Sequence, residues 1–261
     1  TISRRQRQMC IRDSHNLIQI YNYKKKKKNL WCTFSHDQID LNFKDPVVLI
    51  EFIEIILLLL SKGITTFRLD AVAFIWKKHG TSCVNLPETH EIVKLLRLIV
   101  NFINPYALIV TETNLPRKEN LSYFGNNDEA NWIYNFPLPP LILYTFLFED
   151  SSKISGWSKS MPPAQINNAY LNFIASHDGI GMRPAEGILD NIILDKLFKR
   201  VEKNGGKFSF RKVETKNKVY EVNITLFDAL KRTDFDKDGN FAVERYCLLY
   251  TSPSPRDVRS S

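Results

Sequence analysis

The stretch Gly63-Ile-Thr-Thr-Phe-Arg-Leu-Asp-Ala71 holds a short run of β-branched and aromatic residues that ends on a carboxylate, Asp70. Such a run, placed just after a glycine, predicts a β-strand. Upstream, Asp45-Pro46 predicts the start of a helix, because Asp caps a first turn and Pro fits the first helical position. The apolar run Val47–Leu60 then predicts a buried helix that ends at Gly63.

Downstream of this strand the chain alternates between helical and extended patterns. A helix is predicted from Pro87 to about Ile103, with a polar stripe that includes Glu91 and Arg97 and an apolar stripe on the opposite side. Further strands are predicted at three apolar runs: Ala107–Glu112, Asn131–Phe136 and Tyr170–Ser176. Strands that are apolar on both faces and alternate with amphipathic helices predict a parallel sheet in an α/β fold.

Acidic residues follow three of these strands: Asp70, Glu112 and Asp178. Arg68 lies two residues before the first, and His177 lies directly before the third. Acids at the carboxyl ends of parallel strands converge on one rim, which is where (β/α)-barrel active sites lie. An open doubly wound sheet also fits the pattern, although no Gly-rich phosphate loop follows any strand.

Two kinds of chemistry suit three carboxylates on one rim. Hard cations such as Mg²⁺ prefer oxygen ligands. Glycosyl transfer with retention needs a carboxylate nucleophile and a carboxylic acid about 5–5.5 Å apart. Each acid taken singly also fits a structural role as a helix cap. Residue spacing by itself does not separate these readings.

Four motifs resemble conserved regions of the α-amylase clan, glycoside hydrolase family 13. Residues 63–71 resemble its second region, G-x-x-x-x-R-x-D-A, while Thr111-Glu112 resembles the third and Ser176-His177-Asp178 the fourth. Asp37-Gln-Ile-Asp-Leu-Asn42 resembles the motif at the end of the clan's inserted B domain. All four motifs occur in the clan's order and spacing.

Longer stretches resemble the sucrose-phosphorylase-like branch of this clan, which includes glucosylglycerate phosphorylases. They are Gly80–His90, Thr111–Asn114, Phe136–Pro140, Ala175–Gly181, Arg183–Leu189 and Asn223–Leu230. The resemblance covers roughly residues 31–246. It implies a partial (β/α)8 TIM barrel, about strands 4 to 7, with a short remnant of the B domain.

The resemblance also implies a role for each residue on the rim. Asp70 is expected to be the nucleophile, Glu112 the general acid and base, and Asp178 the stabiliser of the transition state. Arg68 is expected to hold Asp70 ionised, and His177 to bind a hydroxyl of the glucose. No metal and no cofactor are implied.

In this branch inorganic phosphate is the co-substrate, so that a disaccharide-like glucoside yields α-glucose 1-phosphate. The expected partners are therefore a small carbohydrate and phosphate. A hydrolase or transglucosidase of the same clan stays open as an alternative. From another class, a non-catalytic carbohydrate-binding remnant also stays open. The sequence does not indicate the oligomeric state.

The two ends of the chain differ from its body. Residues 4–14 and 247–257 resemble translated sequencing-adapter sequence, so we expect residues 1–30 and 247–261 to be non-native or disordered. Residues 31–246 are then the partial catalytic domain. The clan's first region and barrel strands one to three and eight are not seen. We therefore expect this polypeptide alone to be inactive, which robust turnover by the purified chain would refute.

Charge and composition exclude several classes of protein. Residues 1–30 contain nine of the 36 basic residues and one of the 28 acidic ones, which leaves the body neutral and indicates no nucleic-acid partner. The run Val47–Leu60 is too short for a membrane span and holds two glutamates. No secretory signal is recognised, and the four scattered cysteines fit a reducing compartment, so a cytoplasmic location is expected.

Overall fold

The computed structural model describes residues 18–23, 26–35, 37–213, 216–231 and 239–251. The chain divides into two compact units. The first takes its residues from 1–135, 163–171 and 210–218, and the second from 136–162, 172–209 and 219–261.

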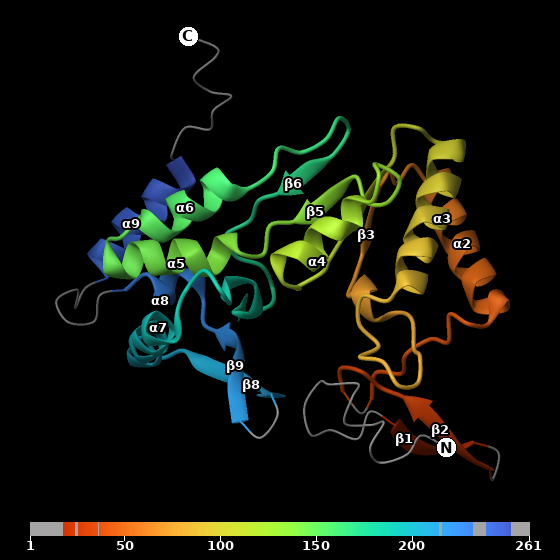
Figure 1. The fold of residues 1–261 in the computed structure, drawn as a ribbon, viewed down its shortest axis with the longest axis horizontal. Coiled ribbons are helices and arrows are strands. Elements are labelled where there is room, and N and C mark those ends of the chain that lie inside the picture. Colours follow the sequence, from red (N-terminus) through yellow and green to blue (C-terminus); the bar gives the residue numbers. More distant parts are fainter. Residues whose placement is uncertain (1–17, 24–25, 36, 214–215, 232–238, 252–261) are drawn as a thin grey trace. The chain divides into compact units, whose positions relative to one another are not determined.

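A four-stranded parallel sheet forms the centre of the first unit (Figure 1). Its strands follow one another in the order β3 (Thr66–Leu69), β4 (Leu108–Thr111), β5 (Trp132–Tyr134) and β6 (Ala169–Leu171). In the register of the first pair, Leu69 lies opposite Thr111, so β3 and β4 end side by side. The parallel sheet predicted from the alternating patterns is confirmed.

Helices pack on the buried side of this sheet. They are α2 (Pro46–Ser61), α3 (Pro87–Ile103) and α4 (Arg117–Leu121), with the short 3-10 turns η1 (Val72–Phe74) and η2 (Ser122–Phe124). The Asp45 side chain accepts a hydrogen bond from the Val47 amide at 3.0 Å, as a helix cap should. Gly63 follows the end of α2 with a φ of +87°, a conformation that favours glycine.

The core of the first unit lies between these helices and the sheet. Phe67 and Leu69 point from β3 into a cluster that includes Ile56 of α2 and Val93 and Leu96 of α3. The strand alternates strictly, since Thr66 and Arg68 are exposed while Phe67 and Leu69 are buried. One face of β3 therefore anchors the helices and the other face is open.

Two expectations about the helices were wrong in part. Of α2, predicted to be buried, only Ile56 is fully buried, and Val47 and Leu58 are more than half exposed. Only one side of α2 packs against described residues of its unit. Arg97, expected on the polar stripe of α3, is buried and donates to the Glu129 carbonyl oxygen at 3.1 Å.

The second unit combines helices with strands of an antiparallel sheet. The helices are α5 (Leu138–Phe148), α6 (Ser152–Ser160), α7 (Asn191–Lys203), α8 (Leu226–Ala229) and α9 (Asn240–Thr251), with the turn η3 (Arg183–Ala185). The sheet has the strand order β7-β9-β8, and the second unit holds β7 (Ile180–Gly181) and parts of β8 (Lys207–Val213) and β9 (Lys216–Asn223). A core of Leu141, Leu143, Leu197, Val201 and Val222 holds this unit together.

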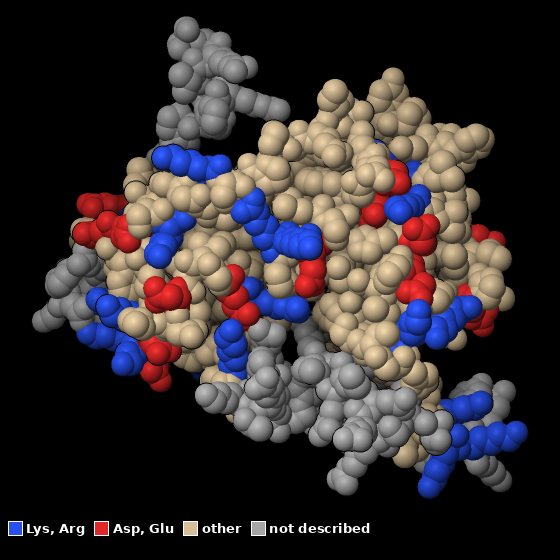
Figure 2. All heavy atoms as spheres, viewed as in Figure 1, with Lys and Arg blue, Asp and Glu red and all other residues tan. Residues whose placement is uncertain are grey.

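An antiparallel hairpin, β1 (Ile18–Tyr23) and β2 (Lys26–Trp31), precedes the sheet. Figure 2 shows basic side chains gathered on it, and Lys26, Lys27 and Lys28 are exposed. The boundary expected after residue 30 falls inside β2, and the one after residue 246 falls inside α9, so the extent of the native domain stays a prediction. Across the described ranges, the structure contains no helix with the length and apolarity that a membrane span requires.

Candidate active site

Strand β3 places Arg68 and Asp70 on the same side of the sheet. Arg68 lies on the exposed face of the strand, and Asp70, two residues on, directly follows its last residue. The alternation of β3 thus carries both side chains away from the helix-covered core. Asp70 remains largely exposed, with 71% of its side chain accessible.

Strand β4 brings Glu112 to the same edge. Glu112 directly follows this strand, and its amide donates to the Leu69 carbonyl oxygen at 3.0 Å. Its carboxylate Oε2 accepts a hydrogen bond of 2.8 Å from the amide of Ala71, the residue after Asp70. The two acids predicted to share a rim are therefore neighbours at the ends of two paired strands.

Ala71 adopts a left-handed backbone conformation, with a φ of +45°. Residues with a Cβ rarely take this conformation, and outliers of this kind cluster at functional sites. Here the turned backbone aims the Ala71 amide at Glu112. The strain therefore has a local consequence, since it fixes one oxygen of that carboxylate.

The guanidinium of Arg68 pairs with Asp70 through Nη1 and Oδ1. It also lies over the ring of Tyr134 from β5, 5.7 Å from the ring centre. Partial burial favours the neutral form of this group, but the charges of Asp70 and Glu112 outweigh it and raise the pKa of Arg68. The positive charge of Arg68 thus lies directly against the Asp70 carboxylate.

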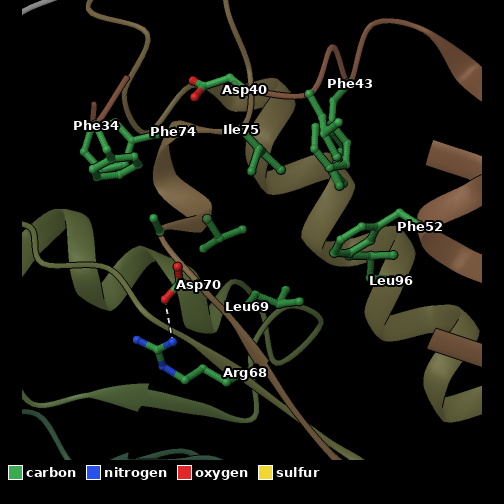
Figure 3. A pocket seen from close by; sticks show the side chains of 14 residues that line it. Phe34, Asp40, Phe43, Phe52, Arg68, Leu69, Asp70, Phe74, Ile75 and Leu96 are labelled. Carbon is green, nitrogen blue, oxygen red and sulfur yellow. Dashed lines mark hydrogen bonds and ion pairs between the residues drawn. The ribbon is translucent and has the colours of Figure 1, made fainter. Parts of the chain in front are cut away.

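A cavity of about 420 Å³ opens beside Asp70. Figure 3 shows the Asp70–Arg68 pair on one side of it and the neighbouring rings of Phe34 and Phe74 on another. Its lining is mostly apolar, and Asp40, Asp70 and Arg68 are its charged members. A cavity of this size, with a few polar groups on apolar walls, suits a small ligand.

His177 and Asp178 lie in the second unit. Strand β6 ends at Leu171, so the prediction of a strand running to Ser176 was wrong and these residues do not follow the strand directly. Their side chains are exposed, with 3.6 Å between His177 Nε2 and Asp178 Oδ2. The structure brings Arg68, Asp70 and Glu112 together in one unit, and the convergence of Asp178 and His177 with them stays a prediction.

Three residues of this site were not singled out as functional from the sequence. Tyr134 lies under Arg68, Phe34 lines the cavity, and Lys77 forms an ion pair with Asp40 on the cavity wall. The sequence motifs quoted above contain none of these three residues, although Asp40, the partner of Lys77, lies in the motif Asp37–Asn42. Within the described part of the chain, no three His, Cys, Asp or Glu side chains group as a metal site requires.

The family model for the α-amylase catalytic domain matches residues 13–179, well over half of the sequence. This chain belongs to the α-amylase family. The match spans the motifs at Asp70, Glu112 and Asp178. The four parallel strands are therefore part of a (β/α)8 barrel, and the exposed face of β3 belongs to the barrel interior.

Among known relatives, the glucosylglycerate phosphorylase of Allomeiothermus silvanus is 44% identical over 221 residues, covering 84% of this chain and 40% of the relative. The glucosylglycerate phosphorylase of Escherichia coli is 41% identical over 227 residues, covering 85% and 41%. This chain therefore spans about two fifths of the length of these relatives.

A solved structure supports the fold along almost the whole chain. The sucrose 6F-phosphate phosphorylase of Thermoanaerobacter thermosaccharolyticum superposes with a TM-score of 0.78 and 21% identity, covering 94% of this chain and 50% of that protein. At this identity the likeness concerns the fold alone. It confirms the partial barrel expected from the motifs.

Proposed function

We propose that the whole protein is a retaining α-glucosyl phosphorylase, which converts glucosylglycerate or a similar glucoside to α-glucose 1-phosphate. The observation that carries this proposal is the pairing of Asp70 and Glu112 at the ends of two adjacent strands, joined through the Ala71 amide. The identity of 41–44% to glucosylglycerate phosphorylases supports the choice of substrate.

In the first step, Asp70 attacks the anomeric carbon while Glu112 protonates the glycosidic oxygen. The bond from the anomeric carbon to that oxygen breaks, glycerate leaves with the proton, and a β-linked glucosyl ester forms on Asp70. In the second step, Glu112 takes a proton from phosphate, whose oxygen displaces Asp70. Two inversions yield the α-phosphate.

The geometry suits these two acids to different roles. Asp70 must be ionised to attack, and the Arg68 guanidinium is its ion-pair partner. Glu112 must be protonated before the first step, and the Ala71 amide occupies its Oε2 as a donor. We propose that Glu112 delivers its proton from Oε1.

The proposal also assigns roles to Asp178 and His177. Asp178 would stabilise the positive charge that develops on the sugar, and His177 would bind a hydroxyl of the same glucose. The partners are a small carbohydrate and phosphate, without nucleic acid, membrane or metal. A cytoplasmic location is part of the same proposal.

The proposal is tested by incubating the whole protein with glucosylglycerate, with and without phosphate. We expect α-glucose 1-phosphate and free glycerate only when phosphate is present. Asp70→Asn should lower kcat/KM by about 10⁴-fold or more, and Glu112→Gln by about 10²–10⁴-fold. Glu91→Gln, an exposed acid paired with Lys94 on α3, serves as the matched control and should stay within about twofold.

The outcome also separates the alternatives. Glucose released without phosphate would indicate a hydrolase, and transfer to a second sugar would indicate a transglucosidase. Sugar binding without turnover that is insensitive to Asp70→Asn would indicate a carbohydrate-binding remnant. Each of these results would contradict phosphorolysis.

A further inference from the structure

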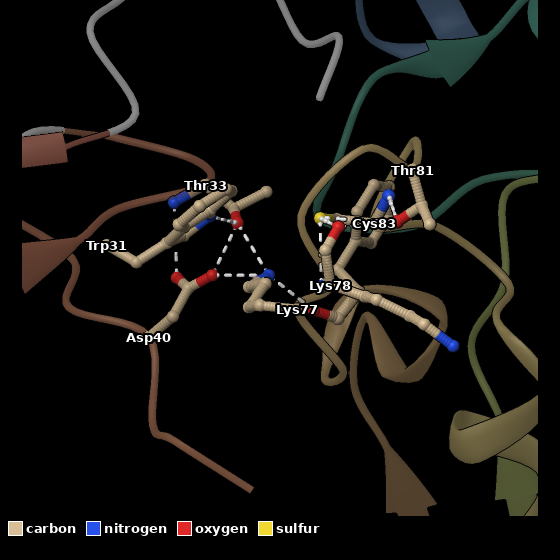
Figure 4. A network of polar contacts seen from close by, with 8 residues as sticks. Trp31, Thr33, Asp40, Lys77, Lys78, Thr81 and Cys83 are labelled. Atoms are coloured by element: carbon tan, nitrogen blue, oxygen red, sulfur yellow. Dashed lines mark hydrogen bonds and ion pairs between the residues drawn. The ribbon is translucent and has the colours of Figure 1, made fainter. Parts of the chain in front are cut away.

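Figure 4 shows a partly buried polar network centred on Lys77, and its member Asp40 also lines the cavity beside Asp70. The Lys77 ammonium has three acceptors: Asp40 Oδ2 at 2.6 Å, Thr33 Oγ1 at 2.9 Å and the carbonyl oxygen of Phe74. An ammonium has three N–H groups, so this one is fully satisfied. Only 16% of the Lys77 side chain is exposed.

The partners of Lys77 also hydrogen-bond to one another. Asp40 Oδ1 accepts from the Thr33 amide at 3.1 Å, and Asp40 Oδ2 accepts from the Thr33 hydroxyl. That hydroxyl also accepts from the Trp31 indole at 3.1 Å, and the Trp31 ring faces the ammonium at 5.7 Å. Fully satisfied networks of this kind hold one conformation.

The network joins two segments that both form the wall of the Asp70 cavity. Phe34, Asp40 and Leu41 line it from the segment of residues 31–41, and Phe74 and Ile75 line it from the turn after β3. The rings of Phe34 and Phe74 meet edge to face at 5.4 Å. Trp31, at the start of this segment, also packs against Cys83 of the loop that follows Lys77.

We propose that Lys77 is a positioning residue: its ion pair with Asp40 holds residues 31–41 against the turn after Asp70 and so sets the shape of the glucoside site. The identity of the ligand in this inference rests on the proposed function. The attachment of the segment to Lys77 rests on the hydrogen-bond network alone. Removing one partner of a buried ion pair leaves an uncompensated charge, so loss of Lys77 should release the segment.

The chain offers a matched control for this residue. Lys78, the next residue, pairs with Glu88 at 2.8 Å, and more than half of its side chain is exposed. Lys77→Met and Lys78→Met therefore remove the same charge from neighbouring positions. Only the first removes the charge that pairs with Asp40, a residue of the cavity wall.

The test uses the whole protein and two readouts. In hydrogen exchange, Lys77→Met should speed exchange of the Thr33 and Asp40 amides by about tenfold or more while α3 keeps its protection. In kinetics, it should raise KM for glucosylglycerate by about tenfold with kcat changed less than about threefold. Lys78→Met should change neither, and adding Asp40→Asn to Lys77→Met should add less than about twofold.

Unchanged exchange of the Thr33 and Asp40 amides in Lys77→Met would show that Lys77 does not hold the segment. Faster exchange with an unchanged KM would show that holding the segment does not shape the glucoside site. If Lys77→Met loses exchange protection along the whole chain, Thr33→Ala, which keeps both charges, is tested instead. It should change exchange and KM in the same direction. The exchange readout needs no turnover. The protein could therefore lack phosphorolysis and still lose protection of the Thr33 and Asp40 amides on Lys77→Met. That result would support the positioning of the segment by Lys77 and would overturn the proposed function.

Discussion

At the scale of single residues, Ala71 has the most unusual conformation in the site. Its φ of +45° costs a residue with a Cβ about 1–2 kcal/mol relative to right-handed backbone. The conformation persists because the same backbone donates to Glu112 and the next turn follows at once. Residue 71 thus links the position of one proposed catalytic acid to the backbone beside the other.

Substitutions at position 71 should therefore follow backbone preference rather than side-chain size. Ala71→Val, which is β-branched, should lower the free energy of unfolding by about 1–2 kcal/mol. Ala71→Gly should leave it unchanged or raise it by up to about 1 kcal/mol, since glycine accepts positive φ. Denaturant titration of both variants checks this, and equal losses in the two would contradict the backbone explanation.

At the scale of elements, the junction between α5 and α6 depends on a single carboxylate. Asp150 Oδ1 accepts from the Ser152 amide at 2.8 Å, which satisfies a free N–H at the start of α6. Its Oδ2 accepts from the Tyr144 hydroxyl of α5 at 2.7 Å. The hydrogen bonds from Ser152 and then Tyr144 lower the pKa of Asp150 to about 2, and the bond to Asp150 raises the pKa of Tyr144 to about 12.

This junction predicts a pH dependence of stability in acid. Because the folded-state pKa of Asp150 is depressed, its contribution is fully present above the unfolded value of about 4 and is lost as the pH falls toward 2. Asp150→Asn should lower stability at pH 7 and flatten the fall between pH 4 and 2. Denaturant midpoints against pH measure this, and parallel curves for wild type and variant would contradict it.

At the scale of the whole molecule, the proposed reaction requires residues from two compact units. Arg68, Asp70 and Glu112 lie in the first unit, whereas His177 and Asp178 lie in the second. In a (β/α)8 barrel, catalytic residues come from the ends of several strands. The roles proposed for His177 and Asp178 therefore stay predictions that activity measurements on the whole protein must test.

Asp178→Asn tests this dependence in the whole protein. It should lower kcat/KM for glucosylglycerate by about 10²-fold or more, because it removes a charge that stabilises the transition state, while the free energy of unfolding stays within about 1 kcal/mol. Asp195→Asn, which changes an exposed acid on α7, is the control for the second unit. Equal activity in the two variants would remove Asp178 from the site.

Residue periodicity and capping were enough to predict several of the local elements. The start of α2 at Pro46, the bounds of α3 and the carboxylates after β3 and β4 follow from patterns a few residues long. The family followed from motifs of similar length. Such features can be predicted from the sequence because they depend on residues that are neighbours along the chain.

Contacts between distant segments were decided by the tertiary structure. Glu112 meets the Ala71 amide across 41 residues only because β3 and β4 pair in one register. Buried Arg97 donates to a carbonyl from a remote loop, and the partly buried Lys77 pairs with Asp40 from a distant segment. Periodicity indicates which side of a helix or strand is apolar. The hydrogen-bond partner of a polar side chain depends instead on which distant segment packs next to it.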